Sequence, residues 1–518
     1  MTVAGPEPST RRRWAGLAVL SASVLIVVMD MTILNVALPA ISEALLPGSA
    51  ELLWIVDVYA LVLAGLLVTA GALGDRWGRK RMLLAGFAVF GAASAAVLLA
   101  GGSAELIAVR AVLGAGGAMI MPSTLSMIRT LFTDPRERAT ALGVWAAMAA
   151  VGAALGPILG GALLEVFSWQ SAFLVNVPIM AVAIVAGLFL LPESRAPRPG
   201  AWDATATVLS IVGMGSLVYG IKRVGEYGLG DLTGTAAGAV AVVALGWFTF
   251  RCLRRPDPLL ELRLFRSRPF TAGVVTALAT SIAIAATLLL LAQWMQLVRG
   301  YGPLETGARL LPAAVAAAVA SPLAPRLAAR VGARAVLAGG LAVSGLGFLV
   351  LFVAPALLGD ASGSFAAGAV ASDGLGYGTV AGALALIGAG QGSLAVASAA
   401  IMSGAPVAKA GSAAAIEETS YEIGGALGVA ILGSVAAAVY RTGLDYRGPS
   451  AEVASESLGG ALTVAAELGQ AGMRLAEQAR SAFTEALTLT SGAGGVLMLL
   501  AGLGVWLMLP RGLDLSRH

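Results

Sequence analysis

The chain alternates between long apolar stretches and short polar ones over nearly its whole length. Each apolar stretch is close to or above the ~20 residues that an α-helix needs to cross a bilayer. Strands are excluded because open sheet edges cannot lie in lipid, and barrel strands hold only ~10 residues. The pattern predicts fourteen membrane helices: Trp14–Leu38, Leu52–Gly74, Met82–Gly101, Leu106–Ile128, Ala139–Leu164, Ala172–Leu191, Thr205–Ile221, Gly234–Phe250, Phe270–Leu297, Leu310–Arg326, Ala335–Leu357, Tyr377–Met402, Ser412–Tyr440 and Leu487–Leu509.

Composition agrees with an all-α integral membrane protein. Of the 518 residues, 58% are hydrophobic and 12% are charged, whereas a soluble domain carries about 25% charged residues. This excludes a soluble enzyme and a disordered chain. The net charge of +4 is too small for a nucleic-acid binder. The single cysteine, Cys252, and the single histidine, His518, argue against a disulfide framework, a metal site and histidine catalysis. We therefore expect neither an enzyme nor a cofactor.

The lysines and arginines predict the orientation. An even number of spans puts both termini on one side of the membrane. Outside the spans, 24 lysines and arginines fall on that side and 8 on the other. Because positive residues accumulate in cytoplasmic loops, both termini are expected in the cytoplasm. The first apolar stretch is long and lacks a small-residue cleavage site, so no cleavable signal peptide is expected.

A weak internal repeat suggests the domain organisation. A basic turn that holds a glycine follows span two at Gly71–Arg81, and a similar turn follows span ten at Pro322–Arg334. If spans nine to fourteen repeat spans one to six, spans seven and eight are an insertion. We therefore expect six-helix bundles at 1–191 and 270–518, inserted helices at 192–269 and an external loop at 441–485. Repeated halves around a midplane site are a transporter architecture.

Two spans carry single buried acids, Asp30 and Asp57. A charge at the bilayer centre costs about 2.5–3.5 kcal/mol on insertion scales, so such residues usually have a function. In one interpretation they are protonatable or cation-binding groups that line a cavity. In the other they make helix-packing hydrogen bonds or already lie at the membrane interface.

Span thirteen carries three acids within six residues, Glu417, Glu418 and Glu422. Glu418 and Glu422 share one helix face, and Glu417 is spaced in the same way from Tyr421. Three carboxylates this close cannot all be ionised in a low dielectric without partners. Either at least one is protonated or a cation binds there. For Glu417 and Glu418, a position at the interface is the alternative.

Three further side chains are candidates for this chemistry. Arg110, near the start of span four, either pairs with a buried carboxylate or extends to the outer surface. Trp54 and Tyr421 each share a helix face with an acid, and could stack on a flat cation. Their alternative is ordinary packing or an interfacial aromatic belt.

Two glycine-containing segments are candidates for conformational motifs. In span five, three glycines recur at four-residue spacing beside a proline that bends the helix, so another helix can lie flush against them. In the turn after span two, an acidic residue lies between glycines and arginines. By accepting hydrogen bonds it can hold two helices together in one conformational state. Packing and positive-inside anchoring are the alternatives. The residues are Gly71, Asp75, Arg76, Gly78, Arg79, Gly152, Gly156, Pro157 and Gly160.

Five segments of the chain resemble motifs of the major facilitator superfamily, and within it of the fourteen-span drug:proton antiporters. They follow one another along the chain in the same order as the family's motifs. The turn after span two is similar to the superfamily's loop motif, and the other four to motifs of spans one, four, five and six. In chain order, the segments are Asp30–Pro39, Gly71–Arg81, Arg110–Gly117, Gly152–Gly161 and Trp169–Pro178.

The acidic segment Glu417–Gly425 further resembles the subset that exports quaternary ammonium compounds and dyes. The resemblance implies a bacterial cytoplasmic-membrane protein, monomeric, that exchanges protons for lipophilic, mostly cationic drugs. It also implies functional carboxylates at Asp30, Asp57, Glu417, Glu418 and Glu422. A nutrient importer, or an exporter dedicated to one antibiotic made by the host, is the alternative.

Overall fold

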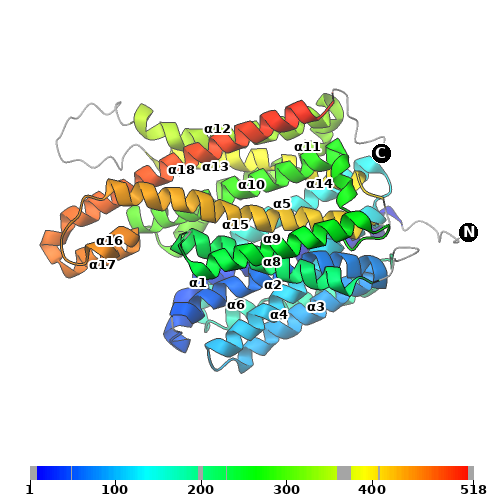
Figure 1. The fold of residues 1–518 in the computed structure, drawn as a ribbon, viewed down its shortest axis with the longest axis horizontal. Coiled ribbons are helices and arrows are strands. Elements are labelled where there is room, and N and C mark those ends of the chain that lie inside the picture. Colours follow the sequence, from blue (N-terminus) through cyan, green and yellow to red (C-terminus); the bar gives the residue numbers. More distant parts are fainter. Residues whose placement is uncertain are drawn as a thin grey trace, which may run out of the picture.

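The computed structural model describes residues 9–47, 49–195, 202–228, 230–358, 375–406 and 409–510. His518 lies outside these ranges. Every regular element within them is helical, and fourteen helices are long and apolar enough to cross a membrane. The predicted all-α membrane fold with fourteen spans is therefore confirmed for the described part of the chain (Figure 1).

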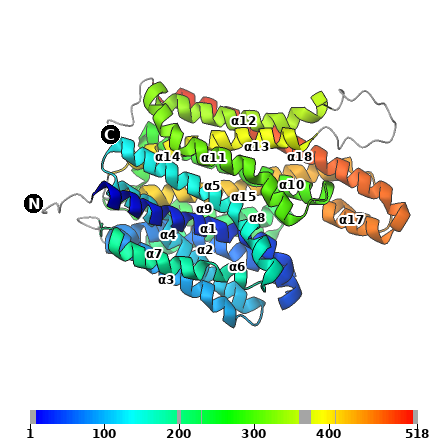
Figure 2. The same ribbon diagram turned by 180° about the vertical axis from the view of Figure 1, so that it is seen from behind.

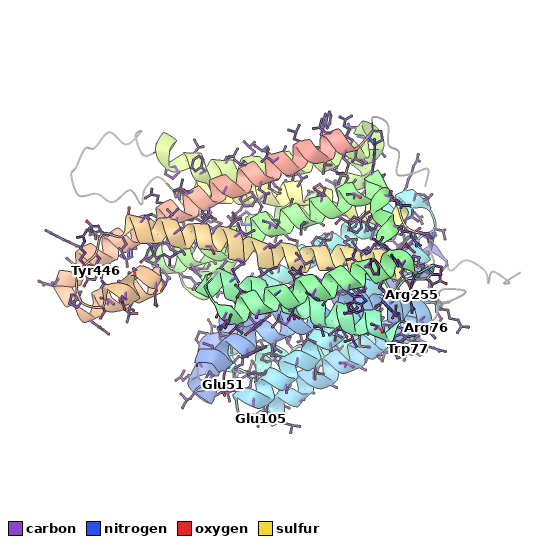
Figure 3. All side chains as sticks on the ribbon, viewed as in Figure 1. Glu51, Arg76, Trp77, Glu105, Arg255 and Tyr446 are labelled. Atoms are coloured by element: carbon purple, nitrogen blue, oxygen red, sulfur yellow. The ribbon has the colours of Figure 1, made fainter. Side chains whose placement is uncertain are left out.

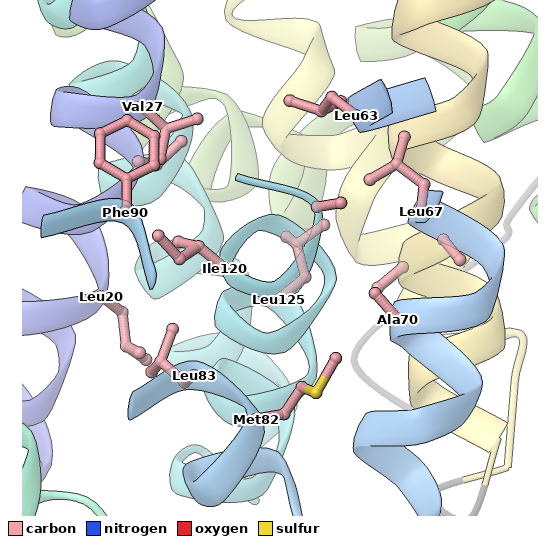
Figure 4. Close-up of a cluster of buried hydrophobic side chains, with 14 of the residues drawn as sticks. Leu20, Val27, Leu63, Leu67, Ala70, Met82, Leu83, Phe90, Ile120 and Leu125 are labelled. Carbon is pink, nitrogen blue, oxygen red and sulfur yellow. The ribbon is translucent and has the colours of Figure 1, made fainter. Parts of the chain in front are cut away.

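The first six spans pack around a shared apolar core. α5 lies along α1, α4 lies between α2 and α3, and α7 packs on α1 and α3. Figure 4 shows side chains of α1 to α4 meeting there, among them Leu20, Leu67, Phe90 and Ile120. The helices are α1 (Thr10–Leu45), α2 (Ser49–Trp77), α3 (Arg79–Ala96), α4 (Ser103–Leu131), α5 (Pro135–Val166), α6 (Ser171–Leu174) and α7 (Asn176–Leu190).

Spans seven and eight form a hairpin of α8 (Ala204–Tyr227) and α9 (Leu232–Arg254). Asp203 caps α8 and accepts a hydrogen bond from Arg251 of α9 at 2.7 Å, with Arg255 also nearby at 3.2 Å. Burial raises the pKa of Asp203, but the hydrogen bonds from Arg251 and the Ala206 amide, with the charges of both arginines, hold it below the usual value. Asp203 is therefore ionised at neutral pH and ties the two helices together.

The last six spans form a second group. α10 packs on α15, α11 on α13, and α12 on α18. α16 and α17 are short helices between α15 and α18. The helices are α10 (Arg268–Gln293), α11 (Pro303–Val331), α12 (Ala333–Leu358), α13 (Tyr377–Gln391), α14 (Ser393–Ser403), α15 (Ala410–Gly443), α16 (Ala451–Glu456), α17 (Leu458–Glu467) and α18 (Met473–Met508).

The two groups meet through α5 against α11 and through α2 against α15, and α8 contacts both α2 and α15. The start of α1 and the end of α18 lie at one end of the bundle, which we call the termini end, and α16 and α17 lie at the other (Figures 1 and 2). Figure 3 places Arg76 and Arg255 at the termini end, and Glu51 and Glu105 at the opposite end.

Several helices run beyond their predicted bounds. α18 begins at Met473 rather than Leu487, and α8 continues to Tyr227 rather than ending at Ile221. Hydropathy detects only the part of a helix that matches the bilayer core, whereas backbone hydrogen bonds continue through charged residues until a cap ends them. The extension of α8 moves Lys222 from a predicted loop into a membrane helix.

The predicted glycine face of α5 packs directly on α1. A methyl group on Gly156 would lie 2.8 Å from the Met29 carbonyl oxygen and would also meet the Thr32 hydroxyl, while Gly152 and Gly160 face α1 in the same way. The close approach therefore depends on the absence of side chains along this stripe.

We predict that Gly156→Ala lowers the thermal unfolding midpoint in detergent, because the added methyl group forces α1 and α5 apart at a cost of about 1–3 kcal/mol. The matched control is Gly161→Ala in the same helix, where the nearest Leu304 atoms lie at an ordinary 3.8 Å. Equal midpoints for the two variants would contradict the packing argument.

Candidate functional site

A cavity of about 590 Å³ lies between helices of both groups and the inserted hairpin. Its polar side chains are few and come from three helices: Asp57 from α2, Lys222 from α8, and Tyr421 and Glu422 from α15. A mainly apolar hollow with a few converging polar groups is the usual form of a small-molecule site. The remaining lining residues are Met31, Ala60, Val218, Gly225, Ala285, Gly425, Ala426, Val429 and Ala430.

Asp57 and Lys222 form an ion pair at the wall of this cavity. Their side chains keep 29% and 30% of their surface exposed, so the pair remains accessible to a ligand. Sequence analysis missed Lys222, because the apolar stretch of its helix ends at the preceding residue. A helical register that continues past Ile221 is the only signal that could have found it.

Two further acidic residues, Glu417 and Glu418, lie on α15 next to the residues of this helix that line the cavity. The Tyr421 hydroxyl donates a hydrogen bond to the Glu417 carboxyl at 3.2 Å, and the Ser398 hydroxyl of α14 donates to the same oxygen. Glu417 and Glu418 are both buried within the protein. One oxygen of each carboxyl has no hydrogen-bond partner among the described residues. Because an unpaired buried carboxylate is very costly, these groups need a proton or a ligand.

Asp30 and Arg110 form a separate, sealed ion pair within the first six spans. Their side chains are 0% and 2% exposed, and the nitrogen to oxygen distance is 3.0 Å. The other Asp30 oxygen accepts a hydrogen bond from Asn176 of α7 at 2.7 Å. Arg110 also lies over the Tyr59 ring, 4.6 Å from its centroid. The structure thus brings Arg110 to a carboxylate, but this pair does not line the cavity.

Trp54 lies beside the cavity and is not among its lining residues. Its ring stacks on Tyr219 of α8 at a centroid distance of 5.9 Å and an interplanar angle of 16°. Trp54 precedes Asp57 by three residues, as Tyr219 precedes Lys222. The stacked rings and the ion pair therefore both join α2 to α8, about one turn apart on each helix.

At the termini end, α2 is fastened to the start of α15. Asp75 accepts a hydrogen bond from the Gly411 amide at 3.1 Å and a 2.7 Å hydrogen bond from Arg79. A methyl group on Gly71 would lie 2.7 Å from the Gly411 carbonyl oxygen. The contact therefore needs both a hydrogen-bonding acid and a glycine, and it holds the two groups of spans together at this end.

The turn after Asp75 completes this contact. Gly78 has a φ of 118°, which favours glycine, and the chain then enters α3 at Arg79. Arg79 donates further hydrogen bonds to the hydroxyls of Thr130 and Ser194 at 3.2 and 3.3 Å. Arg76, in the same turn, lies at the termini end (Figure 3).

Near the termini end, α5 and α11 also approach closely. A methyl group on Gly143 would lie 2.6 Å from the Ser321 carbonyl oxygen. Farther along, Pro157 contacts Gly307 of α11, where an added methyl group would lie 3.3 Å away. Pro157 therefore belongs to the interface between the two groups, while the glycines beside it face α1.

Sequence comparisons place the chain among transporters. Residues 20–429 match the profile of the Major Facilitator Superfamily. The multidrug efflux pump LfrA of Mycolicibacterium smegmatis is 38% identical over 96% of this chain and 97% of its own. The methyl viologen resistance protein SmvA of Salmonella typhimurium is 36% identical over 96% of this chain and 99% of its own.

Structural comparison gives the same fold. The solved structure of the proton:xylose symporter XylE covers 97% of both chains with a TM-score of 0.60 at 13% sequence identity, which is evidence for the fold alone. Together with the profile match over most of the sequence, it identifies the chain as a multi-pass membrane protein that belongs to the Major Facilitator Superfamily.

Proposed function

We propose that the protein exports lipophilic, mainly cationic compounds across the bacterial cytoplasmic membrane in exchange for protons. The observation that carries this proposal is the cavity, in which Asp57 and Glu422 approach one apolar hollow from different groups of spans. The names of the relatives, a multidrug efflux pump and a methyl viologen resistance protein, support export of drug-like cations.

The exchange follows from competition for the same carboxyl groups. An ionised carboxylate in an apolar cavity attracts a cation strongly, and it attracts a proton for the same reason. The apolar wall contributes the remaining affinity and selects lipophilic compounds. A compound that enters from the cytoplasm is released outside when protons take the carboxyls.

Transport also needs two states with different affinities for the substrate. We propose that the units 1–191 and 270–518 move against each other, with 192–269 packed at their junction. The contact of Asp75 and Gly71 with Gly411 closes the termini end in one state and separates in the other. The termini end is the cytoplasmic end in this proposal, because the basic loops gather there.

The remaining acids take supporting roles in the same proposal. Glu417 and Glu418 hold protons next to the cavity, and Tyr421 connects Glu417 to it. Asp30 and Arg110 couple protonation to helix packing, because a proton on Asp30 would break its ion pair. Substitution of Asp30 would leave buried Arg110 without its counter-ion at a cost of about 3–5 kcal/mol, so Asp57 and Glu422 are the cleaner test sites.

The experiment that tests the function is an efflux assay in a host that lacks its own drug pumps. Cells that express the protein are loaded with ethidium, and the dye is followed before and after a protonophore is added. We expect low accumulation that rises when the proton gradient collapses. A proton-coupled importer would give the reverse, and resistance to a single antibiotic with no dye efflux would indicate a dedicated exporter.

We predict that Asp57→Asn reduces the rate of ethidium efflux at least tenfold, because the cavity loses the charge on which substrate and proton compete. The matched control is Asp445→Asn, which removes a carboxylate with an 86% exposed side chain. Full uphill efflux by the Asp57 variant in vesicles would refute the role.

We predict that Glu422→Gln weakens the export of dications more than that of monocations. A dication needs two carboxylates, whereas a monocation needs one, so methyl viologen resistance should fall about tenfold and ethidium resistance no more than about threefold. The control is Glu467→Gln, at an exposed position of α17. An equal loss for both substrates in a dose-response panel counts against the assignment.

We predict that Asp75→Asn abolishes transport while leaving dye binding measurable. The variant loses the charge-assisted hydrogen bonds from Arg79 and Gly411, which stabilise the state closed at the termini end. Efflux in vesicles and binding in detergent are measured on the same protein. Wild-type transport would show that this contact does not control the closed state.

A further inference from the structure

We propose that Lys222 is an internal cation that occupies Asp57 in the absence of substrate and that a cationic substrate has to displace. This role would make the inserted helix α8 part of the binding site, and it would make Lys222 a determinant of charge selectivity. The inference deepens the proposed function, since it takes the substrate to be a lipophilic cation.

The geometry places Lys222 where the charge of a substrate would bind. Its ammonium group pairs with Asp57, and both side chains line the cavity. Its charge also acts on Glu422, which lines the cavity from the side of α15. One lysine therefore shares the cavity with both carboxyl groups that a bound cation would use, and it is paired with one of them.

This pair differs from the other ion pair inside the membrane helices. Asp30 and Arg110 are sealed from solvent and held by further hydrogen bonds from Asn176 and to the Ile55 carbonyl. Asp57 and Lys222 are each about a third exposed and face a hollow large enough for a small molecule. A cation in the cavity can therefore reach the exposed pair but not the sealed one.

The position of Lys222 is fixed by packing on both sides of α8. One turn before it, Tyr219 stacks on Trp54 of α2. One turn after it, Gly225 packs on Ala430 of α15, where an added methyl group would lie 2.9 Å from its backbone. The helix that carries the lysine is thus wedged between α2 and α15, the helices that carry the two carboxyl groups.

A lysine suits this role chemically. Its ammonium group is a compact charge on a flexible four-carbon stem, so it can leave Asp57 without any movement of the helix. Tethering keeps its local concentration near the carboxylate high, in the millimolar range or above. A substrate displaces it only if apolar contacts add to its charge, which favours lipophilic cations over small inorganic ions.

The same competition would assist release. When the substrate departs, Lys222 returns to Asp57 and neutralises it, so the emptied cavity does not hold an unpaired carboxylate. Removal of the lysine charge should therefore strengthen equilibrium binding of monocations and slow their release.

The test measures equilibrium binding of ethidium to the full-length protein in lipid nanodiscs, in alkaline buffer where protons compete least. We expect Lys222→Gln and Lys222→Met to bind ethidium about tenfold more tightly than wild type, since each removes one repelling charge. Lys222→Arg should bind like wild type. Arg223→Gln, which removes the neighbouring charge that pairs with Asp231 outside the cavity, should also leave binding unchanged.

Binding of an uncharged lipophilic dye separates charge from structure. It should be the same in wild type and in both neutral variants, whereas a loss of packing would change it. Equal or weaker ethidium binding by both neutral variants, with wild-type binding measurable, overturns the inference and leaves the proposed function standing. If wild type binds no cationic dye, the proposed function fails and the inference fails with it.

Discussion

The structure depends on one constraint, which is that carboxyl groups inside a low-dielectric bundle must be paired, protonated or bound to a cation. The protein meets it in three ways. Asp30 is sealed from the cavity and paired with Arg110 and Asn176. Asp57 is paired with a lysine that faces a cavity. Glu417 and Glu418 are buried with one oxygen each left without a hydrogen-bond partner in the described residues. We propose that these three arrangements provide a sealed ion pair, an exchangeable charge and a site for protons.

The fold supports this chemistry by bringing distant segments to one place. The cavity takes its polar groups from α2, α8 and α15, which are far apart in the sequence. Glycines at the contact points allow the helices to approach closely, as where Gly71 meets Gly411 and where Gly156 meets α1.

Much of this could be predicted from the sequence. Fourteen apolar stretches gave the number of spans, and isolated acids within them singled out Asp57 and Glu422, because charged residues in lipid are costly enough to be conspicuous. Helix ends could not be predicted to within a turn, and that error hid Lys222. Partners that are ordinary small or polar residues, such as Ser398 and Gly411, carry no signal until the fold brings them to an acid. Trp54 shares a helix face with Asp57 as expected, yet it stacks on Tyr219 instead of lining the cavity.

The central claim is that substrate and protons compete for the same carboxyl groups, and proton release on binding tests it most directly. Purified protein in a weakly buffered solution with a pH indicator is mixed with a lipophilic cation, and the protons released are counted against the cation bound. The account predicts about one proton or more released for each cation, falling as the starting pH rises. Binding that releases no proton at any pH would contradict it.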